Sequence, residues 1–340
     1  MSVLSNLLIP AVLFFALGFV ARVIKSDLRF PQDLSKILSI YLLMAIGLHG
    51  GYELGKADLG VAFIAILWAL VLGFTLPVLG YLMLVATGRV DRMNAAAIAA
   101  HYGSVSAGTF LTAIAYLDNL NITYESYPVI MLAVMESPAI IVGLLLASWS
   151  RQRLAVQQNG GGASSLSLNL PGEESSSSMK SLLHEAFTNG SVVLLIGSML
   201  IGAVSAPGSM EKLFPFIDDI FMGFLCMFLF EMGMEAGRRI KEFKKVGPVL
   251  VGFGIVMPLV GGLIGVAVGV YALGLSEGGA TLVAVLAASA SYIAVPPAMR
   301  LAVPESNPSF YLTLALGITF PFNVVIGIPL YHALVQQLMA

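Results

Sequence analysis

The sequence predicts an all-α polytopic membrane protein with ten transmembrane helices, arranged as two inverted five-helix repeats whose helices are interrupted near the bilayer midplane. Three observations predict this fold: an apolar composition, ten long apolar runs, and motifs that recur in both halves of the chain. Of the 340 residues, 58% are hydrophobic and 11% are charged. Because soluble domains carry about 25% charged residues, this chain cannot cover a water-exposed surface.

The ten apolar runs are the predicted spans, since a helix needs about 20 mostly apolar residues to cross a bilayer. In chain order they are 6–24, 37–53, 59–87, 93–117, 127–149, 190–206, 215–236, 247–273, 278–302 and 308–337. A hydrophilic stretch separates the fifth run from the sixth, and its glycine and serine runs are typical of a flexible linker. The predicted organisation is a first repeat at 1–149, a cytoplasmic linker at 150–189 and a second, inverted repeat at 190–340.

The lysines and arginines predict how the spans are oriented. When alternate connections are assigned to opposite sides, all 17 of these residues except Lys56 and Lys212 fall on one side. Positively charged residues accumulate in cytoplasmic loops. The sequence therefore predicts a multi-pass protein of the bacterial inner membrane, with both termini on the non-cytoplasmic side.

Motifs in the two halves correspond at a nearly constant offset. The motif at 104–106 in the fourth span corresponds to 289–291 in the ninth, and Pro138 in the fifth span corresponds to Pro321 in the tenth. Each half holds an odd number of spans, so the second half crosses the membrane in the opposite direction. Inverted repeats are typical of secondary transporters, whose sites lie where equivalent helices are interrupted near the midplane.

The fourth and ninth spans contain clusters of glycine, serine and proline that predict such interruptions. Proline removes a backbone donor, and the segment after an interruption begins with free N–H groups and the positive end of a helix dipole, which suits an anion. Close packing of small residues between helices is the alternative explanation. The predicted substrate-binding residues are Ser104, Ser106, Thr109, Ser289, Ser291 and Tyr292. The predicted helix-break residues are Gly103, Gly108, Pro138, Pro296, Pro297 and Pro321.

Glu136 lies in the middle of the fifth span, where a charge is costly unless it is paired or hydrated. We interpret it as an ion ligand, with a proton carrier and an interhelical hydrogen bond as alternatives. Neutral hydroxyl and amide oxygens suit a hard cation. The predicted sodium-binding residues are Glu136, Ser106, Ser291, Thr319 and Asn323.

No motif supports catalysis. His184 begins a sequence like that of a zinc-protease helix, but Thr188 occupies the position of the second histidine. The region around Ser106 resembles a nucleophile elbow, but Ser104 stands where the first glycine is required. The only cysteine is Cys226. The sequence therefore predicts no enzymatic activity, no cofactor, no transition-metal site and no nucleic-acid partner.

Several motifs resemble those of the sodium-dependent bicarbonate transporters of the SbtA type. The resemblance rests on the motifs at 45–51, 103–109, 135–138, 296–300 and 304–309, and it extends over essentially the whole chain. It implies a core domain and a gate domain in each protomer, a homotrimer, and uptake of bicarbonate with sodium. It also implies a small PII-like regulatory protein on the cytoplasmic face.

Five positions depart from the pattern of this family. Tyr292 stands where the transporting members have an aspartate, and Ala294-Val295 stand where they have Ser-Gly. Ser104 replaces an alanine and Glu136 replaces an aspartate. The change at 292 removes a plausible sodium ligand next to the predicted site, whereas the other serine and threonine positions of that site match.

The preferred interpretation is a secondary active transporter that imports a small anion, in its specific form a sodium-coupled bicarbonate symporter that works by alternating access. Sodium is the predicted coupling ion, because a bound cation offsets the cost of placing an anion at the bilayer midplane. Two alternatives remain open. One is a sodium- or proton-coupled transporter of another small anion, such as a carboxylate, and the other is a non-transporting membrane sensor of the same fold.

Overall fold

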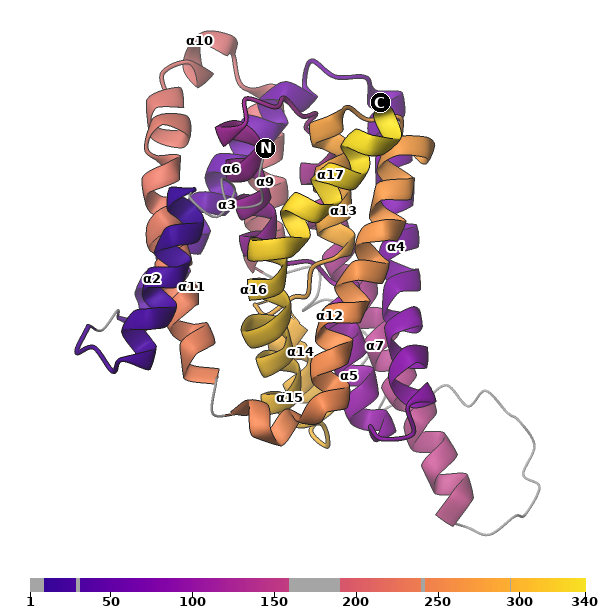
Figure 1. The fold of residues 1–340 in the computed structure, drawn as a ribbon. Helices are drawn as coiled ribbons and strands as arrows, with labels where there is room; N and C mark the ends of the chain where they lie inside the picture. The colour runs from indigo at the N-terminus through magenta and orange to yellow at the C-terminus, as the bar shows by residue number, and fades with distance from the viewer. Residues whose placement is uncertain (1–8, 29–30, 159–189, 240–241, 294) are drawn as a thin grey trace.

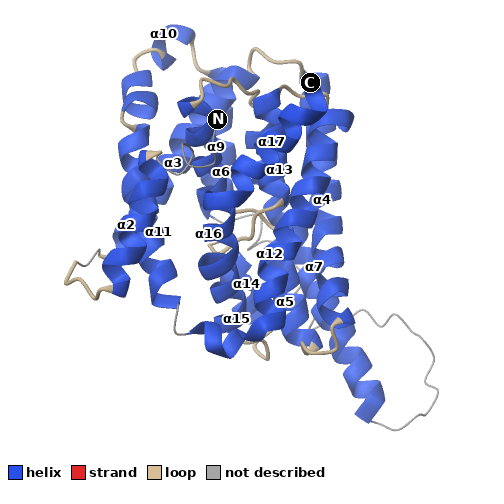
Figure 2. Cartoon of the chain, viewed as in Figure 1, coloured by secondary structure: helices blue, strands red, loops and turns tan. Residues whose placement is uncertain are grey.

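The computed structural model describes residues 9–28, 31–158, 190–239, 242–293 and 295–340, and every regular element within these ranges is a helix (Figure 2). The part of the predicted linker from residue 159 onward lies outside the described residues. In the described part, five helical segments are long and apolar enough to cross a membrane: Lys36–Leu54, Leu59–Ala86, Tyr127–Arg153, Val246–Ala272 and Pro308–Met339. The chain is therefore an all-helical, multi-pass membrane protein.

Four of the described helices form a first bundle, in which α2 packs on α11 and α3 packs on α9 (Figure 1). Each pair joins a helix from the first half of the chain to one from the second half. The short elements α10 and η1 connect α9 to α11. The bounds are α2 (Pro10–Val23), α3 (Gln32–Leu54), α9 (Gly190–Val204), α10 (Pro207–Met210), η1 (Pro215–Asp219) and α11 (Phe221–Arg239).

Glycines determine how closely these helices approach. A Cβ atom on Gly233 of α11 would lie 2.0 Å from the carbonyl oxygen of Phe15 in α2. A Cβ atom on Gly51 of α3 would lie 2.0 Å from the carbonyl oxygen of Met199 in α9. The backbones therefore touch directly at both crossings, as small residues allow in lipid.

The remaining helices form a second bundle, in which α4 packs against α5 and α7, and α12 packs against α13. Helix α7 continues past residue 150, the predicted start of the linker. The bounds are α4 (Leu59–Ala86), α5 (Arg92–Gly103), α6 (Ala107–Asn119), α7 (Tyr127–Gln158), α12 (Phe243–Ala267), η3 (Val268–Ala272), α13 (Glu277–Ala287), α14 (Val295–Ala302), α15 (Pro308–Leu312), η4 (Thr313–Thr319), α16 (Phe320–Phe322), η5 (Asn323–Gly327) and α17 (Ile328–Met339).

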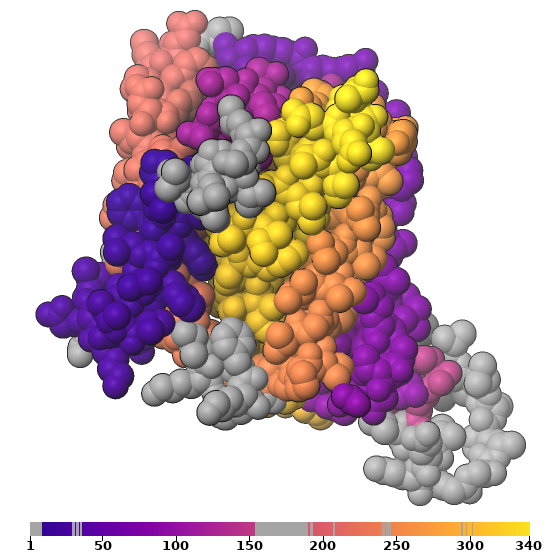
Figure 3. Space-filling model, viewed as in Figure 1, coloured from indigo at the N-terminus to yellow at the C-terminus, as the bar shows by residue number. Residues whose placement is uncertain are grey.

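The C-terminal segment from α15 to α17 lies on the surface between α2 and α12 (Figure 3). Phe15 of α2 meets Phe320 of α16 there, with ring centroids 5.4 Å apart in an edge-to-face arrangement. The two bundles thus contact each other along this segment.

The two interruptions predicted for the fourth and ninth spans are present. Helix α5 ends at Gly103 and α6 begins at Ala107, whereas α13 ends at Ala287 and α14 begins at Val295. The predicted break residues flank these gaps: Gly103 and Gly108 at the first, and Pro296 and Pro297 in the opening turn of α14.

The interruptions predicted at Pro138 and Pro321 are wrong. Helix α7 runs through Pro138 without a break, and Gly73 of α4 leaves room for the proline, since a Cβ atom there would lie 3.0 Å from Pro138 Cβ. Pro321 lies in α16, between the π-helical turns η4 and η5. In membrane helices, neighbouring helices and locally widened turns accommodate prolines, so the helix bends or widens instead of ending.

Candidate functional site

The two interrupted segments cross and pair with each other. The backbone N–H of Ser106 donates to Ser289 Oγ at 2.9 Å, and the backbone N–H of Ser291 donates to the carbonyl oxygen of His101 at 2.8 Å. An unsatisfied backbone group in the hydrocarbon region costs several kcal/mol. The two interruptions therefore stabilise one another, because each supplies an acceptor for a backbone N–H of the other.

Ser106 is the N-cap residue of α6. Its Oγ accepts a hydrogen bond from the Thr109 backbone N–H at 3.1 Å and another from Thr109 Oγ1 at 2.9 Å. A serine in extended conformation before a helix caps it in this way, which explains why α6 begins where it does. The hydroxyl hydrogen of Ser106 is not used in these contacts, so it can donate to the neighbouring Tyr292 phenol or to a ligand.

Ser289 and Thr109 have structural roles in this conformation. The hydroxyl of Ser289 donates to the carbonyl oxygen of Leu286 at 2.9 Å while it accepts from Ser106. The hydroxyl of Thr109 is used on Ser106. Among the predicted substrate-binding residues, Ser104 is different again, because its buried Oγ has no hydrogen-bond partner among the described residues. The sequence grouped these side chains together. In the structure, the hydroxyls of Ser289 and Thr109 form hydrogen bonds that hold the interrupted segments in place, whereas Ser104 Oγ has no described partner.

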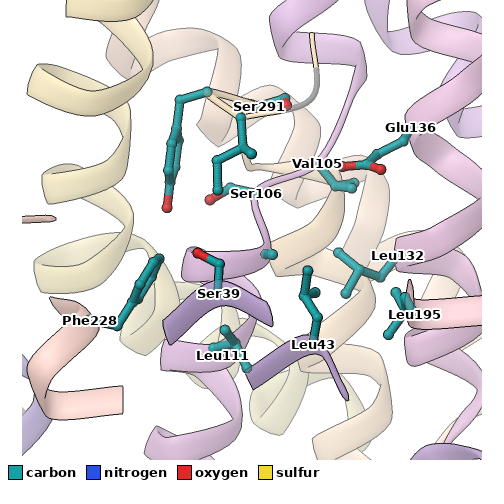
Figure 4. Close-up of a pocket in the computed structure, with 13 residues that line it drawn as sticks. Ser39, Leu43, Val105, Ser106, Leu111, Leu132, Glu136, Leu195, Phe228 and Ser291 are labelled. Carbon is teal, nitrogen blue, oxygen red and sulfur yellow. The ribbon is translucent and has the colours of Figure 1, made fainter. Parts of the chain in front are cut away.

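A small cavity, which we call the chamber, lies beside the crossing and between the two bundles (Figure 4). Its volume is about 20 Å³, enough for one water molecule or a small ion. The predicted residues that line it are Ser106, Ser291, Tyr292 and Glu136. Ser39 of α3 and Phe228 of α11 also line it, and sequence reasoning missed both. A lone serine or phenylalanine in an apolar run carries no local signal, since only helix packing decides which of them faces the chamber.

Glu136 is the only ionisable carboxylic acid among the residues that line the chamber. It projects from α7 toward the interrupted segment of α5 and α6 (Figure 4). No described residue forms a hydrogen bond or an ion pair with it. A buried carboxylate needs a partner or a proton, so the chamber is suited to a cation next to Glu136.

The predicted sodium ligands Thr319 and Asn323 are not brought to the chamber. Thr319 Oγ1 donates to the carbonyl oxygen of Gly254 at 2.7 Å and is bonded to Tyr102 Oη at 2.6 Å. Asn323 Nδ2 donates to the carbonyl oxygen of Ala288 at 2.8 Å. These two side chains connect the C-terminal segment to its neighbours, and their oxygens are occupied.

Tyr292 occupies the side of the chamber nearest α6. Its ring packs edge-on against Phe320, with centroids 5.7 Å apart, and the residue is 8% exposed. A Cβ atom on Gly108 would lie 2.3 Å from Tyr292 Oη. The glycine in the first turn of α6 therefore makes room for the phenol ring, which reduces the free volume of the chamber.

A larger cavity of about 630 Å³, which we call the outer cavity, lies above the chamber. Successive turns of α3, α6 and α7 line first the chamber and then the outer cavity. His49 Nδ1 lies 3.1 Å from Asp218 Oδ1 at its wall, and Asp118 lines the opposite side on α6. Burial raises the pKa of the Asp118 carboxyl, although a hydrogen bond with Tyr124 opposes this shift. The two cavities therefore follow one another along the same three helices.

The sequence profile of the Na+-dependent bicarbonate transporter superfamily matches residues 10–336. This match covers both bundles, both interruptions and every residue of the chamber. No curated protein matches the sequence significantly.

Proposed function

The chain belongs to the Na+-dependent bicarbonate transporter superfamily, and from this membership we propose that it imports bicarbonate together with sodium by alternating access. The observation that carries the proposal is Glu136, a carboxylate with no partner among the described residues, in a chamber formed where two interrupted helices cross. Sodium beside Glu136 neutralises the charge of this carboxylate, and the Ser291 hydroxyl adds an oxygen ligand. Ser106 Oγ accepts two hydrogen bonds from Thr109 in this conformation, so it joins the proposed sodium ligands only when Thr109 releases it. Thr319 and Asn323 are left out of this proposed site.

The proposed anion position is the first turn of α6. Backbone N–H groups and the helix dipole favour negative charge at a helix start, and the free hydroxyl hydrogens of Ser106 and Ser291 can donate to it. In the present conformation the chamber holds only a water-sized particle. The bundles must therefore separate for the anion to enter from the outer cavity, and this movement is the proposed alternating access.

The packing of the first bundle supports an inverted repeat. If the chain has ten spans, α2 and α9 are equivalent as the first spans of each half, and α3 and α11 are equivalent as the second spans. A two-fold axis in the membrane plane exchanges the two halves, so it maps the contact of α11 with α2 onto that of α3 with α9, and both contacts are present. We therefore propose repeats at 1–149 and 190–340, each interrupted pair counting as one span.

The remaining features extend this proposal. The distribution of lysine and arginine favours the bacterial inner membrane with both termini outside the cytoplasm. The homotrimer and the PII-like partner are proposed on the resemblance to SbtA-type transporters. Proton coupling through Glu136 is the second candidate, because an unpaired buried carboxylate can also be neutralised by a proton.

Uptake of labelled bicarbonate into proteoliposomes tests the proposal. With an inward sodium gradient we expect accumulation, and Glu136→Gln should reduce it by about tenfold or more, the effect of losing roughly 1.4 kcal/mol or more of ion binding. Glu211→Gln is the control, since Glu211 is exposed and lines neither cavity. Accumulation that follows a proton gradient and ignores sodium would overturn the sodium coupling. No uptake of bicarbonate under either gradient would overturn the substrate.

A further inference from the structure

Trp149 lies between two guanidinium groups at one end of the second bundle. The Cζ atom of Arg153 is 4.1 Å from the centroid of the indole ring, and that of Arg92 is 5.8 Å away. The tryptophan is 40% exposed, so neither the ring nor the arginines are enclosed by protein. A guanidinium that stacks on an aromatic face keeps its N–H groups directed outward, where they can donate to a ligand.

The charges of this cluster are not balanced by the described residues. Other arginines on the same face have carboxylate partners: Arg151 pairs with Glu305 at 2.8 Å, and Arg238 pairs with Glu235 at 3.0 Å. No described residue forms an ion pair with Arg92 or Arg153, nor with Arg89 in the adjoining turn.

The nearest acid in sequence, Asp91, has another role. Its side chain caps α5 and accepts hydrogen bonds from the backbone and the side chain of Asn94. Arg92 is also the first residue of α5, where a positive charge opposes the helix dipole. Its position is therefore not explained by helix stability, whereas an anionic ligand would explain it.

An apolar strip leads to this cluster. Exposed side chains recur every three or four residues along α4, at Val71, Phe74, Val78 and Leu82, and therefore share one face of the helix. Tyr81, which precedes Leu82 and is buried, contacts the Trp149 ring at a centroid distance of 6.1 Å, so the end of the strip nearest Leu82 lies close to the tryptophan. Helices α4 and α7 lie side by side here. The surface thus combines an apolar strip with a positively charged, aromatic end.

We propose that Arg92, Arg153 and Trp149, with Arg89, bind the phosphate of an anionic phospholipid whose acyl chains lie along the exposed face of α4. Tryptophan is enriched at the level of the lipid headgroups, and clusters of basic residues next to a membrane helix attract anionic lipids. Arginine is suited to this role because its planar fork donates two parallel hydrogen bonds to phosphate. The arginines would contact the phosphate, the tryptophan ring would lie at the glycerol level, and the apolar strip of α4 would contact the acyl chains.

Thermal unfolding of the purified chain in a neutral detergent tests this proposal. Added phosphatidylglycerol should raise the unfolding temperature, whereas phosphatidylcholine and inorganic phosphate should not. The double substitution Arg92→Gln with Arg153→Gln should abolish most of the rise. Arg238→Gln should keep it, because that arginine is exposed on the same face but paired.

Counting bound lipid by native mass spectrometry gives an independent readout, with fewer phosphatidylglycerol adducts expected on the double variant. If the double variant does not fold, Arg153→Gln alone serves, since that side chain is exposed. An equal rise with phosphatidylcholine or with inorganic phosphate would overturn the proposal. So would an undiminished rise, or unchanged adduct counts, in a folded variant.

Discussion

The two helix interruptions cross at one point but are built differently. The first, between α5 and α6, is short and ends in a serine that caps the next helix with its own side chain. The second, between α13 and α14, is longer and is followed by two prolines in the opening turn of α14. Both segments bring a serine to the chamber, Ser106 from the first and Ser291 from the second, but only the second adds a large side chain, that of Tyr292. The comparison indicates that the two segments share the interruption itself and differ in the side chains that they bring to the chamber.

Substitution of Gly108 should disturb the packing between the two interrupted segments, and we expect it to lower stability more than the other substitutions discussed below. In Gly108→Ala the new Cβ atom would lie 2.3 Å from Tyr292 Oη. Overpacking of a tight interior costs about 1–3 kcal/mol, and we expect the upper part of this range because both sides are buried. Thermal unfolding and sodium-dependent uptake should both decline.

The combination with Tyr292→Phe should recover much of this loss, because it removes the oxygen that clashes. Tyr292→Phe alone is the control and should lose little stability, since the phenol oxygen has only a weak interaction with the Ser106 side chain. If the double variant is no more stable than Gly108→Ala, the alanine disturbs α6 itself rather than its contact with the second interruption.

Substitution of Ser289 tests whether its hydrogen bond with the Ser106 backbone stabilises the first interruption. Ser289→Ala leaves the backbone N–H of Ser106 without its acceptor at membrane depth. A buried donor without a partner costs about 1–3 kcal/mol, so we expect a lower unfolding temperature. Ser104→Ala is the matched control, because Ser104 Oγ is buried but has no described partner, and its loss should leave stability unchanged. Equal stability of the two variants would contradict the bracing role.

The smallest expected effect is on the pH dependence of stability. It concerns two carboxylates near the ends of α6 and α14 that lie farthest from the interruptions. Burial raises the pKa of Asp118 at the end of α6, whereas the hydrogen bond from Arg151 lowers the pKa of Glu305 just beyond α14. Stability contributed at Asp118 is present below its ordinary pKa of 3.8 and is lost as the pH rises through the raised value. Stability contributed at Glu305 is present above its ordinary pKa of 4.5 and is lost as the pH falls.

Unfolding temperatures measured from acid to neutral pH separate the two groups. Asp118→Asn should remove a decline on going to neutral pH, and Glu305→Gln should remove a decline on going to acid pH. Variants that change the profile in the same direction would contradict this contrast between the two half-helices.

The sequence predicted the positions of both interruptions and four of the residues that line the chamber. Glycine, serine and proline act on the backbone locally, so their clusters are readable without knowledge of packing. The errors at Pro138 and Pro321 have a different origin, because whether a proline ends a membrane helix depends on the neighbouring helix. Thr319 lies away from the chamber for a related reason: a hydroxyl in a membrane helix can bind a ligand or a neighbouring carbonyl, and only the packing decides between them.

The paired backbone of the two interruptions has a consequence for biosynthesis. The backbone N–H of Ser106 donates to Ser289 Oγ. When the ribosome has completed α6, this donor is already synthesised, whereas Ser289 has not yet been translated. Until the segment after α13 is inserted, we expect the backbone N–H of Ser106 to be hydrogen-bonded to water or to the translocation machinery. A chain truncated after α7 should be recognised as incomplete and degraded, even though its individual helices are apolar enough to insert.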